Sequence, residues 1–182
     1  AEVGTASPEA TTAAVEAGTQ KRRELKHYSG AMFYYGGEWY WSVDRLYHLE
    51  GRLAALGADT QPGAPLIAPR PGEDLAGHRD TGQFKLELYA SLRSPYTAVI
   101  FDRAVAFAKA AGVTLSLRPV LPMVMRGVPA TREKGMYIFM DAAREALVAG
   151  VPYGNFYDPI GEPARRCYAL YPCLLYTSPS PR

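Results

Sequence analysis

The segment from Phe84 to Val120 constrains the fold more than any other part of the chain. It begins with "FKLELYA", in which apolar and polar residues alternate as in a half-buried strand. A helical segment follows and ends at Gly112, and "VTLSLRPV" then predicts a second strand. One face of the helix is marked by Ile100, Ala104, Phe107, Ala108 and Ala111. Because two strands joined by a helix cross over right-handed into a parallel pair, we predict a βαβ unit and an α/β fold.

The helix of this unit begins in "RSPYT", residues 93–97, and this motif has two interpretations. In the structural one, Pro95 is the first helical residue and Ser94 is its N-cap, and Thr97 is a first-turn helix residue. In the functional one, the unsatisfied N–H groups of the helix start attract an anion that Ser94 contacts. Tyr96 fits a pocket wall and a core position equally well. Arg93 either attracts a carboxylate or is solvated.

The regions on either side of this unit have patterns of their own. Residues 8–27 predict a helix, and "AMFYYGGEWYW" predicts a hairpin, since a Gly36-Gly37 turn suits positive φ at both positions. A second helix follows, with Ser42 as its N-cap and Gly57 at its end. Four prolines and four glycines between residues 58 and 83 predict a semi-extended linker. A further helix is expected from about Arg132 to Ala149.

Composition excludes several classes of partner. The 20 basic and 18 acidic residues are interspersed, so we expect no nucleic-acid partner. The apolar runs are too short to cross a bilayer, so we expect no membrane partner. Neither Cys167 nor Cys173 belongs to a Cys-x-x-Cys pair, and no signal peptide is evident, which predicts a cytoplasmic location. The histidines match no metal-ligand spacing, so no metal is expected.

The stretch "FKLELYASLRSPYTAVIFDRAVAFAKAAGVTLSLRPVLP" resembles the start of DsbA-like thioredoxin-fold proteins. It is most similar to the branch of 2-hydroxychromene-2-carboxylate isomerases and kappa-class glutathione transferases, which reads Ser-Pro-Tyr where redox relatives read Cys-Pro-x-Cys. The likeness continues into the family's helical insertion, through Arg118-Pro119 and then Lys134, Tyr137, Asp141 and Arg144. Similarly, "SGAMFYYGGEWYWSVDRLYHLEGRL" resembles the terminal hairpin and helix of the same fold.

The resemblance implies parts of two thioredoxin-like domains in one chain. Residues 1–57 correspond to the C-terminal part of a first domain, 58–83 to the linker, and 84–172 to the N-terminal part of a second domain with its helical insertion. The tail 173–182, "CLLYTSPSPR", resembles vector-derived sequence. We therefore expect a piece of a tandem-domain protein whose exposed sheet edges favour self-association. Alternatively, the hairpin of the first part completes the sheet of the βαβ unit as a permuted domain.

Two positions depart from the family pattern. Ala31 stands where the fold usually has a cis-proline. Because a cis bond before alanine costs about 2.5–4 kcal/mol, we predict a trans bond and an altered pocket wall. In addition, "GVPATR" lacks an asparagine that isomerase relatives often have, which counts against chromene-type substrate specificity.

The resemblance implies a glutathione-dependent isomerase or transferase that acts on a small-molecule substrate. Ser94 would be the catalytic residue that stabilises the glutathione thiolate, and Arg93, Pro95, Tyr96 and Thr97 would contact glutathione. A helix dipole of about 0.3–1 kcal/mol and a hydrogen bond to a charge of about 1.5–3 kcal/mol bring a thiol pKa from about 8.5 close to neutrality. Disulfide exchange at this motif is excluded, because it needs a thiolate where the chain has hydroxyls. The alternative is a catalytically silent thioredoxin-like module that binds a partner or supports an oligomer.

Overall fold

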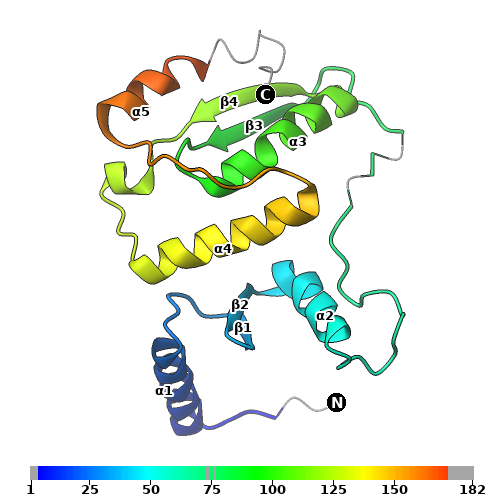
Figure 1. Cartoon of the computed structure of the whole chain (residues 1–182), viewed down its shortest axis with the longest axis vertical. Coiled ribbons are helices and arrows are strands. Elements are labelled where there is room, and N and C mark those ends of the chain that lie inside the picture. The colour runs from blue at the N-terminus through cyan, green and yellow to red at the C-terminus, as the bar shows by residue number, and fades with distance from the viewer. Residues whose placement is uncertain (1–3, 73, 76, 172–182) are drawn as a thin grey trace. The chain divides into compact units, whose positions relative to one another are not determined.

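The computed structural model describes residues 4–72, 74–75 and 77–171. In these residues the protein is a mixed α/β structure with five α-helices and two two-stranded sheets (Figure 1). Its contacts define two compact units: Ala1–Gly72 with Thr131–Tyr137 form unit 1, and Glu73–Ala130 with Ile138–Arg182 form unit 2. Among the described residues, each sheet pairs two strands of the same unit. No helix in this part of the chain is long and apolar enough to span a bilayer.

Unit 1 begins with α1 (Pro8–Glu24) and a β-hairpin. The Ser7 hydroxyl caps α1 by accepting a hydrogen bond from the Ala10 N–H at 3.2 Å. Strands β1 (Met32–Tyr35) and β2 (Glu38–Trp41) are antiparallel. Gly36 and Gly37 between them have φ of 55° and 86°, as a type I′ turn requires. The predicted helix and hairpin are therefore confirmed.

The second helix of unit 1, α2 (Leu46–Ala55), starts differently from the prediction. Ser42 has φ of 45° and ψ of −150°, its side chain forms no capping hydrogen bond, and a 3-10 turn (Val43–Arg45) precedes the helix. The predicted N-cap is wrong, because a capping side chain reaches the helix N–H groups from the extended backbone region. The end of the helix is as predicted, with Gly57 at φ of 70°.

Arg52 of α2 holds the hairpin turn in place. Its guanidinium donates to the Gly36 carbonyl and to the Tyr40 hydroxyl, both at 3.1 Å, and forms an ion pair with Glu38 at 3.2 Å. Tyr40 is only 1 % exposed. One cation thus satisfies the turn carbonyl and the buried hydroxyl together, which fixes α2 against β2.

A buried histidine lies at the centre of unit 1. His27 is 5 % exposed, and its ring packs against Tyr28, Trp39 and Tyr137, the last on the first turns of α4 (Arg132–Ala149). Burial lowers the pKa of His27, against the opposing hydrogen bond to the Ser29 backbone. His27 is therefore a core residue. The Gly30–Ala31 peptide is trans, as alanine at position 31 predicts, and Ala31 has φ of 54°.

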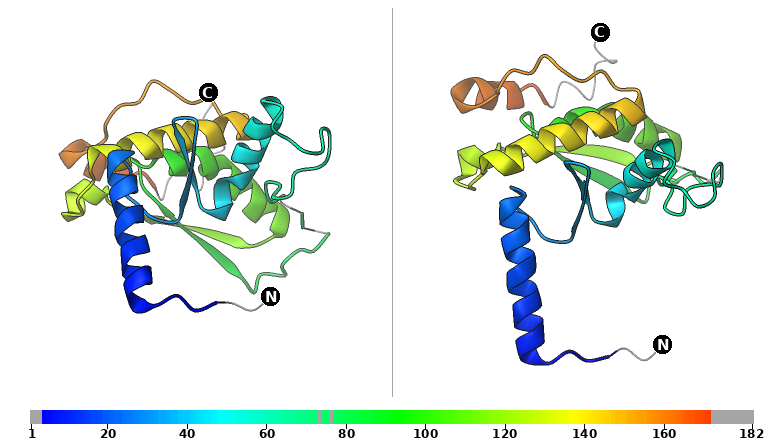
Figure 2. Two further views of the ribbon diagram at one scale, coloured as in Figure 1. Left: turned by 90° about the horizontal axis from the view of Figure 1, so that it is seen from below. Right: turned by 60° about the horizontal axis from the view of Figure 1, so that its bottom comes forward.

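Unit 2 contains the predicted βαβ unit. Strands β3 (Lys85–Ala90) and β4 (Thr114–Pro119) are parallel, and their register runs from Lys85 opposite Thr114 to Ala90 opposite Pro119. Helix α3 (Pro95–Ala111) connects them and packs against them (Figures 1 and 2). Gly112, with φ of 73°, ends α3 in the left-handed conformation that the sequence predicted.

The predicted apolar face of α3 is only partly buried. The buried residues of the helix are Pro95, Val99, Ala104, Ala108 and Ala111. Ile100 and Phe107, which the pattern assigns to the same face, are 49 % and 36 % exposed. The two strands that pair here do not cover the whole apolar surface of a helix this long. Ile100 and Phe107 are therefore partly exposed to solvent, where they could contact another protein surface.

A helix that the sequence pattern does not identify completes the core of unit 2. It is α5 (Gly161–Tyr168), and Tyr168 and Tyr171 pack with Ala90 of β3. The Tyr168 hydroxyl donates to the Val120 carbonyl at 2.6 Å and accepts from the Leu92 N–H at 3.1 Å. It therefore ties together the chain segments that leave β3 and β4.

The linker has no helix or strand in its described residues, but it is anchored at two places. The Ile67 and Ala68 N–H groups donate to the Glu50 carboxylate of α2 at 2.7 and 2.8 Å. Farther along, the Asp80 N–H donates to the Ala111 carbonyl at 2.7 Å. The segment contains turns, and hydrogen bonds join it to α2 and to α3.

Candidate functional site

The start of α3 is the candidate site, and Ser94 is its N-cap (Figure 1). Its backbone is extended, with φ of −85° and ψ of 116°, and its hydroxyl oxygen accepts a hydrogen bond from the Thr97 N–H at 3.3 Å. Pro95 is the first helical residue and is buried. This is the helix start that the sequence predicted. Because the Ser94 oxygen acts as an acceptor here, its own proton is left to donate.

The turn before α3 is held by hydrogen bonds on both sides. The Ser94 N–H donates to the Ser91 carbonyl at 3.0 Å, and the Ser91 N–H donates to the Thr97 hydroxyl at 3.3 Å. The Leu92 N–H donates to the Tyr168 hydroxyl. The Thr97 side chain therefore fixes the shape of the turn on which Ser94 lies.

Tyr96 is bonded to a buried carboxylate. Its hydroxyl donates to Oδ2 of Asp141 at 2.7 Å, and Asp141, on α4, is 0 % exposed. Arg144 donates to Oδ1 of the same carboxylate at 3.2 Å. A carboxylate removed from water is costly unless it is paired and hydrogen-bonded, and here both conditions are met. The result is a polar anchor between the first turn of α3 and the middle of α4.

Arg93 forms a two-point ion pair with Asp158, in the segment between α4 and α5. Its Nε lies 2.5 Å from Oδ1 and its Nη2 lies 3.0 Å from Oδ2. The hydrogen bond to Arg93 lowers the pKa of Asp158, and the same bond raises the pKa of Arg93. The two side chains are 34 % and 56 % exposed, so the pair lies at the surface.

The five predicted site residues are consecutive, and the structure adds the residues around them. Asp141 and Arg144 carry part of the family likeness but have no role assigned by the sequence. Asp141 comes four residues after Tyr137, so the two lie on the same face of α4, and that face is buried. This spacing is the sequence signal that predicts a buried carboxylate. No pattern predicts that Asp158 lies opposite Arg93, because the two residues are 65 positions apart.

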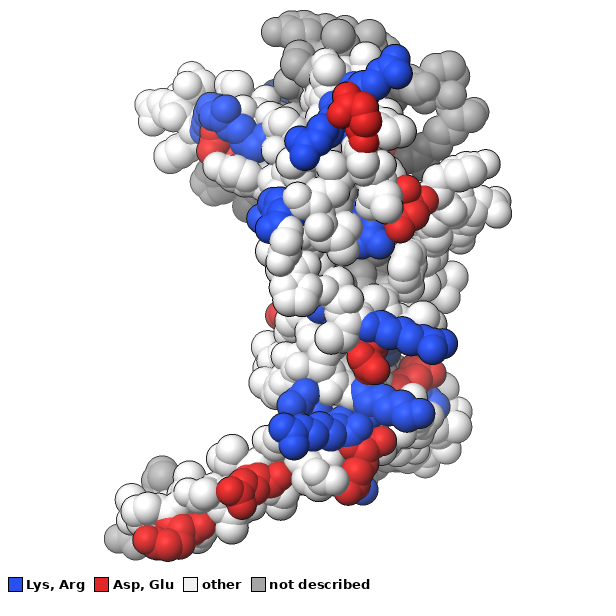
Figure 3. Space-filling model, turned by 90° about the vertical axis from the view of Figure 1, so that its left-hand side faces the viewer, with Lys and Arg blue, Asp and Glu red and all other residues white. Residues whose placement is uncertain are grey.

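The donors at the start of α3 suit an anion. They are the Ser94 hydroxyl and the Arg93 guanidinium, because Pro95 has no N–H and the Thr97 N–H is already bonded to Ser94. Within the described ranges, no three His, Cys, Asp or Glu residues gather as a metal ion requires. Cys167 of α5 is an exposed free thiol, and Cys173 lies outside the described residues, as does the rest of the predicted tail. On the face drawn in Figure 3, basic and acidic side chains are interspersed.

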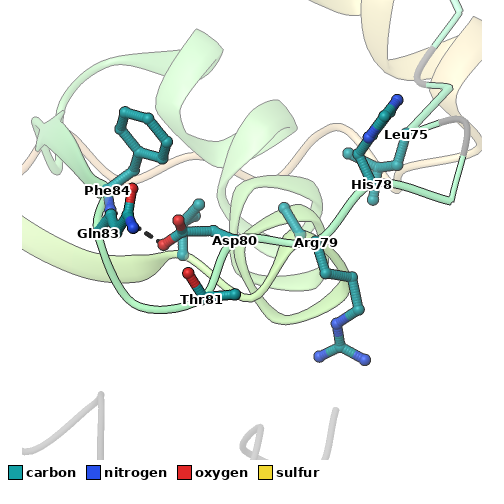
Figure 4. Close-up of a pocket in the computed structure, with 9 residues that line it drawn as sticks. Leu75, His78, Arg79, Asp80, Thr81, Gln83 and Phe84 are labelled. Atoms are coloured by element: carbon teal, nitrogen blue, oxygen red, sulfur yellow. Dashed lines mark hydrogen bonds between the residues drawn. The ribbon is translucent and has the colours of Figure 1, made fainter.

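Two surface depressions of unit 2 do not include any of the five predicted site residues. One, of about 390 Å³, lies between the segment 75–84 and the end of α3 (Figure 4). There the Asp80 carboxylate accepts the Phe84 N–H at 3.0 Å, while the side chains of His78 and Arg79 point in different directions. The other, of about 370 Å³, lies along β4 beside Tyr168 and Tyr171.

Comparisons of the chain with protein-family models, with curated proteins and with solved structures found no match.

Proposed function

We propose that this chain contains parts of thioredoxin-like domains of the DsbA family, and that it binds glutathione at the start of α3. Ser94 donates its hydroxyl proton to the glutathione sulfur and so favours the thiolate. The observation that carries the proposal is the capping hydrogen bond: Ser94 accepts the Thr97 N–H with its oxygen and keeps its proton for a ligand. The β3–α3–β4 unit supports it, because a strand leads directly into this helix start.

The thiolate serves a glutathione-dependent isomerase or transferase. In an isomerase, the sulfur adds to the unsaturated carbon of a carbonyl compound, the resulting single bond rotates, and the sulfur leaves with its electron pair. In a transferase, the sulfur attacks an electrophilic carbon, a leaving group departs with the electron pair of the broken bond, and the new C–S bond remains. Neither reaction changes the oxidation state of the protein, so the hydroxyls of Ser94 and Thr97 are sufficient.

A second candidate is a thioredoxin-like module without catalytic activity. Two observations favour it. Arg93, Tyr96 and Thr97 all have hydrogen-bond partners within the protein, as a purely structural helix start would have. In addition, Ile100 and Phe107 expose apolar surface on α3, which suits contact with another protein.

Glutathione titration, followed by the ultraviolet absorbance of the thiolate, tests the proposal. The wild-type chain should bind glutathione saturably and lower its thiol pKa, and Ser94→Ala should lose both effects. Because alanine also removes the N-cap, Ser94→Gly is measured beside it, since glycine costs the helix only a few tenths of a kcal/mol. Ser91→Ala, which removes a hydroxyl from the same turn, is the control and should bind normally.

The outcomes separate the two candidates. Saturable binding with an unchanged thiol pKa would leave a glutathione site but remove the role of Ser94. If the wild-type chain gives a folded far-ultraviolet circular dichroism spectrum and does not bind glutathione, the glutathione site is wrong and the silent module is favoured.

A further inference from the structure

Arg93 holds Asp158 in the geometry that arginine uses for a bound carboxylate. Two N–H groups, on Nε and Nη2, donate to the two oxygens of one carboxylate. This fork arrangement recognises the planar carboxylate group itself, whichever molecule carries it. Arg93 is also the residue directly before Ser94 in the chain. A carboxylate site is thus already formed and filled at the start of α3.

We propose that Asp158 is an internal substitute for a ligand carboxylate, and that glutathione binds by replacing Asp158 on Arg93 with one of its own carboxylates. This role rests on the glutathione site proposed above and assigns Arg93 to the binding of a carboxylate there. Asp158 then sets the affinity of the site, because each glutathione molecule must compete with it. Ser94 and Arg93 hold different parts of the same ligand, the sulfur and a carboxylate.

The surroundings of Asp158 make this exchange inexpensive. Its side chain is 56 % exposed, and an exposed ion pair contributes little to stability because water screens it. Asp158 lies in a segment without helix or strand, between the end of α4 and the start of α5. Its side chain can therefore turn toward water without disturbing the core formed by Ala90, Tyr168 and Tyr171. The exchange also replaces one carboxylate by another, so Arg93 keeps an equivalent partner.

The other carboxylate near this helix start has the opposite properties. Asp141 is 0 % exposed and is held by both Tyr96 and Arg144. Releasing it would leave a charge buried without its partners, which is far more costly than moving Asp158. Of the two carboxylates, only Asp158 is suited to leave when a ligand arrives.

The test is binding of S-methylglutathione, which keeps both carboxylates of glutathione and has no thiol. Asp158→Asn should tighten binding about two- to fivefold, the factor that corresponds to removing an exposed ion pair. Asp158→Ala is measured in parallel, so that the result does not depend on how one substitution is accommodated. Arg93→Gln should weaken binding, and Arg93→Gln combined with Asp158→Asn should bind no better than Arg93→Gln alone. The control is Glu87→Gln, which removes an acidic group from another exposed pair, that with Arg118, and should leave binding unchanged.

Each outcome decides the role of Asp158 independently of Ser94. A gain in both Asp158 variants that needs Arg93 supports the competition, even where the thiol pKa experiment finds no role for Ser94. No gain, or an equal gain in Glu87→Gln, overturns it, even where glutathione binds and its thiolate is stabilised. If no variant binds S-methylglutathione, the proposed competition is wrong together with the glutathione site.

Discussion

Replacing Tyr96 by Phe tests whether the contact with Asp141 stabilises unit 2. The change removes one hydroxyl and keeps the ring, so no large cavity is formed. It deprives a carboxylate that is 0 % exposed of a hydrogen bond of 2.7 Å, while the bond from Arg144 stays. A hydrogen bond to a charged group contributes about 1.5–3 kcal/mol, and we expect the free energy of unfolding to fall by this amount.

Urea denaturation followed by circular dichroism measures the effect, and the chain offers a matched control. Tyr89 also donates its hydroxyl to a carboxylate, that of Glu87, at 3.1 Å, but Tyr89 is 65 % exposed. Water replaces that hydrogen bond at once, so Tyr89→Phe should leave the unfolding midpoint unchanged. Both variants lose the same atom from the same residue type. Their difference therefore reports the burial of the acceptor.

The reasoning is refuted if Tyr96→Phe is no less stable than Tyr89→Phe. Asp141 would then have no need of the tyrosine hydroxyl, and Tyr96 would contribute through its ring alone. The slope of the unfolding free energy against urea concentration reports the surface exposed on unfolding. If Tyr96→Phe changes this slope as well, its loss of stability is not assigned to the hydrogen bond alone.

Two further predictions concern the C-terminal end of α3 and the core of unit 1. Gly112→Ala should destabilise the chain by more than about 1 kcal/mol, because φ is 73° and the new Cβ would lie 2.8 Å from the Asp80 carbonyl oxygen. Gly127→Ala, with φ of 71° and nothing within 4 Å, should show the backbone cost alone in the same denaturation assay. Because burial lowers the pKa of His27, the folded state binds fewer protons than the unfolded state below about pH 6.5. Stability should therefore fall as the pH drops below that value. His27→Gln should flatten this dependence, and an unchanged dependence would refute the assignment.

The elements that the sequence predicts correctly are those whose signals are local. The hairpin follows from two adjacent glycines, and the start and end of α3 follow from Ser94, Pro95 and Gly112. Each is set by the φ preference or capping ability of one or two residues. The prediction for Ser42 is wrong because its φ is 45°, a conformation that the preference of serine for N-cap positions does not predict.

The site residues that could not be predicted depend on long-range contacts. The pairing of Arg93 with Asp158 and of Leu92 with Tyr168 joins positions 65 and 76 residues apart. Helix α5 brings Tyr168 to this place, although its segment has the composition of a loop. Its position is fixed by the packing of Tyr168 against Ala90, and only the folded chain supplies that neighbour.

The exposure of each partner decides which of the five predicted residues are able to serve a ligand. Tyr96 is bonded to a carboxylate that water does not reach, and Thr97 accepts the N–H that sets the turn, so a ligand that took either would have to disrupt the fold. Pro95 is buried in the first turn. Arg93 has a partner that water can replace, and Ser94 keeps a proton while it caps the helix. Under the proposed function, a ligand at the start of α3 would therefore depend on Ser94 and Arg93, and the three other residues would hold these two in place.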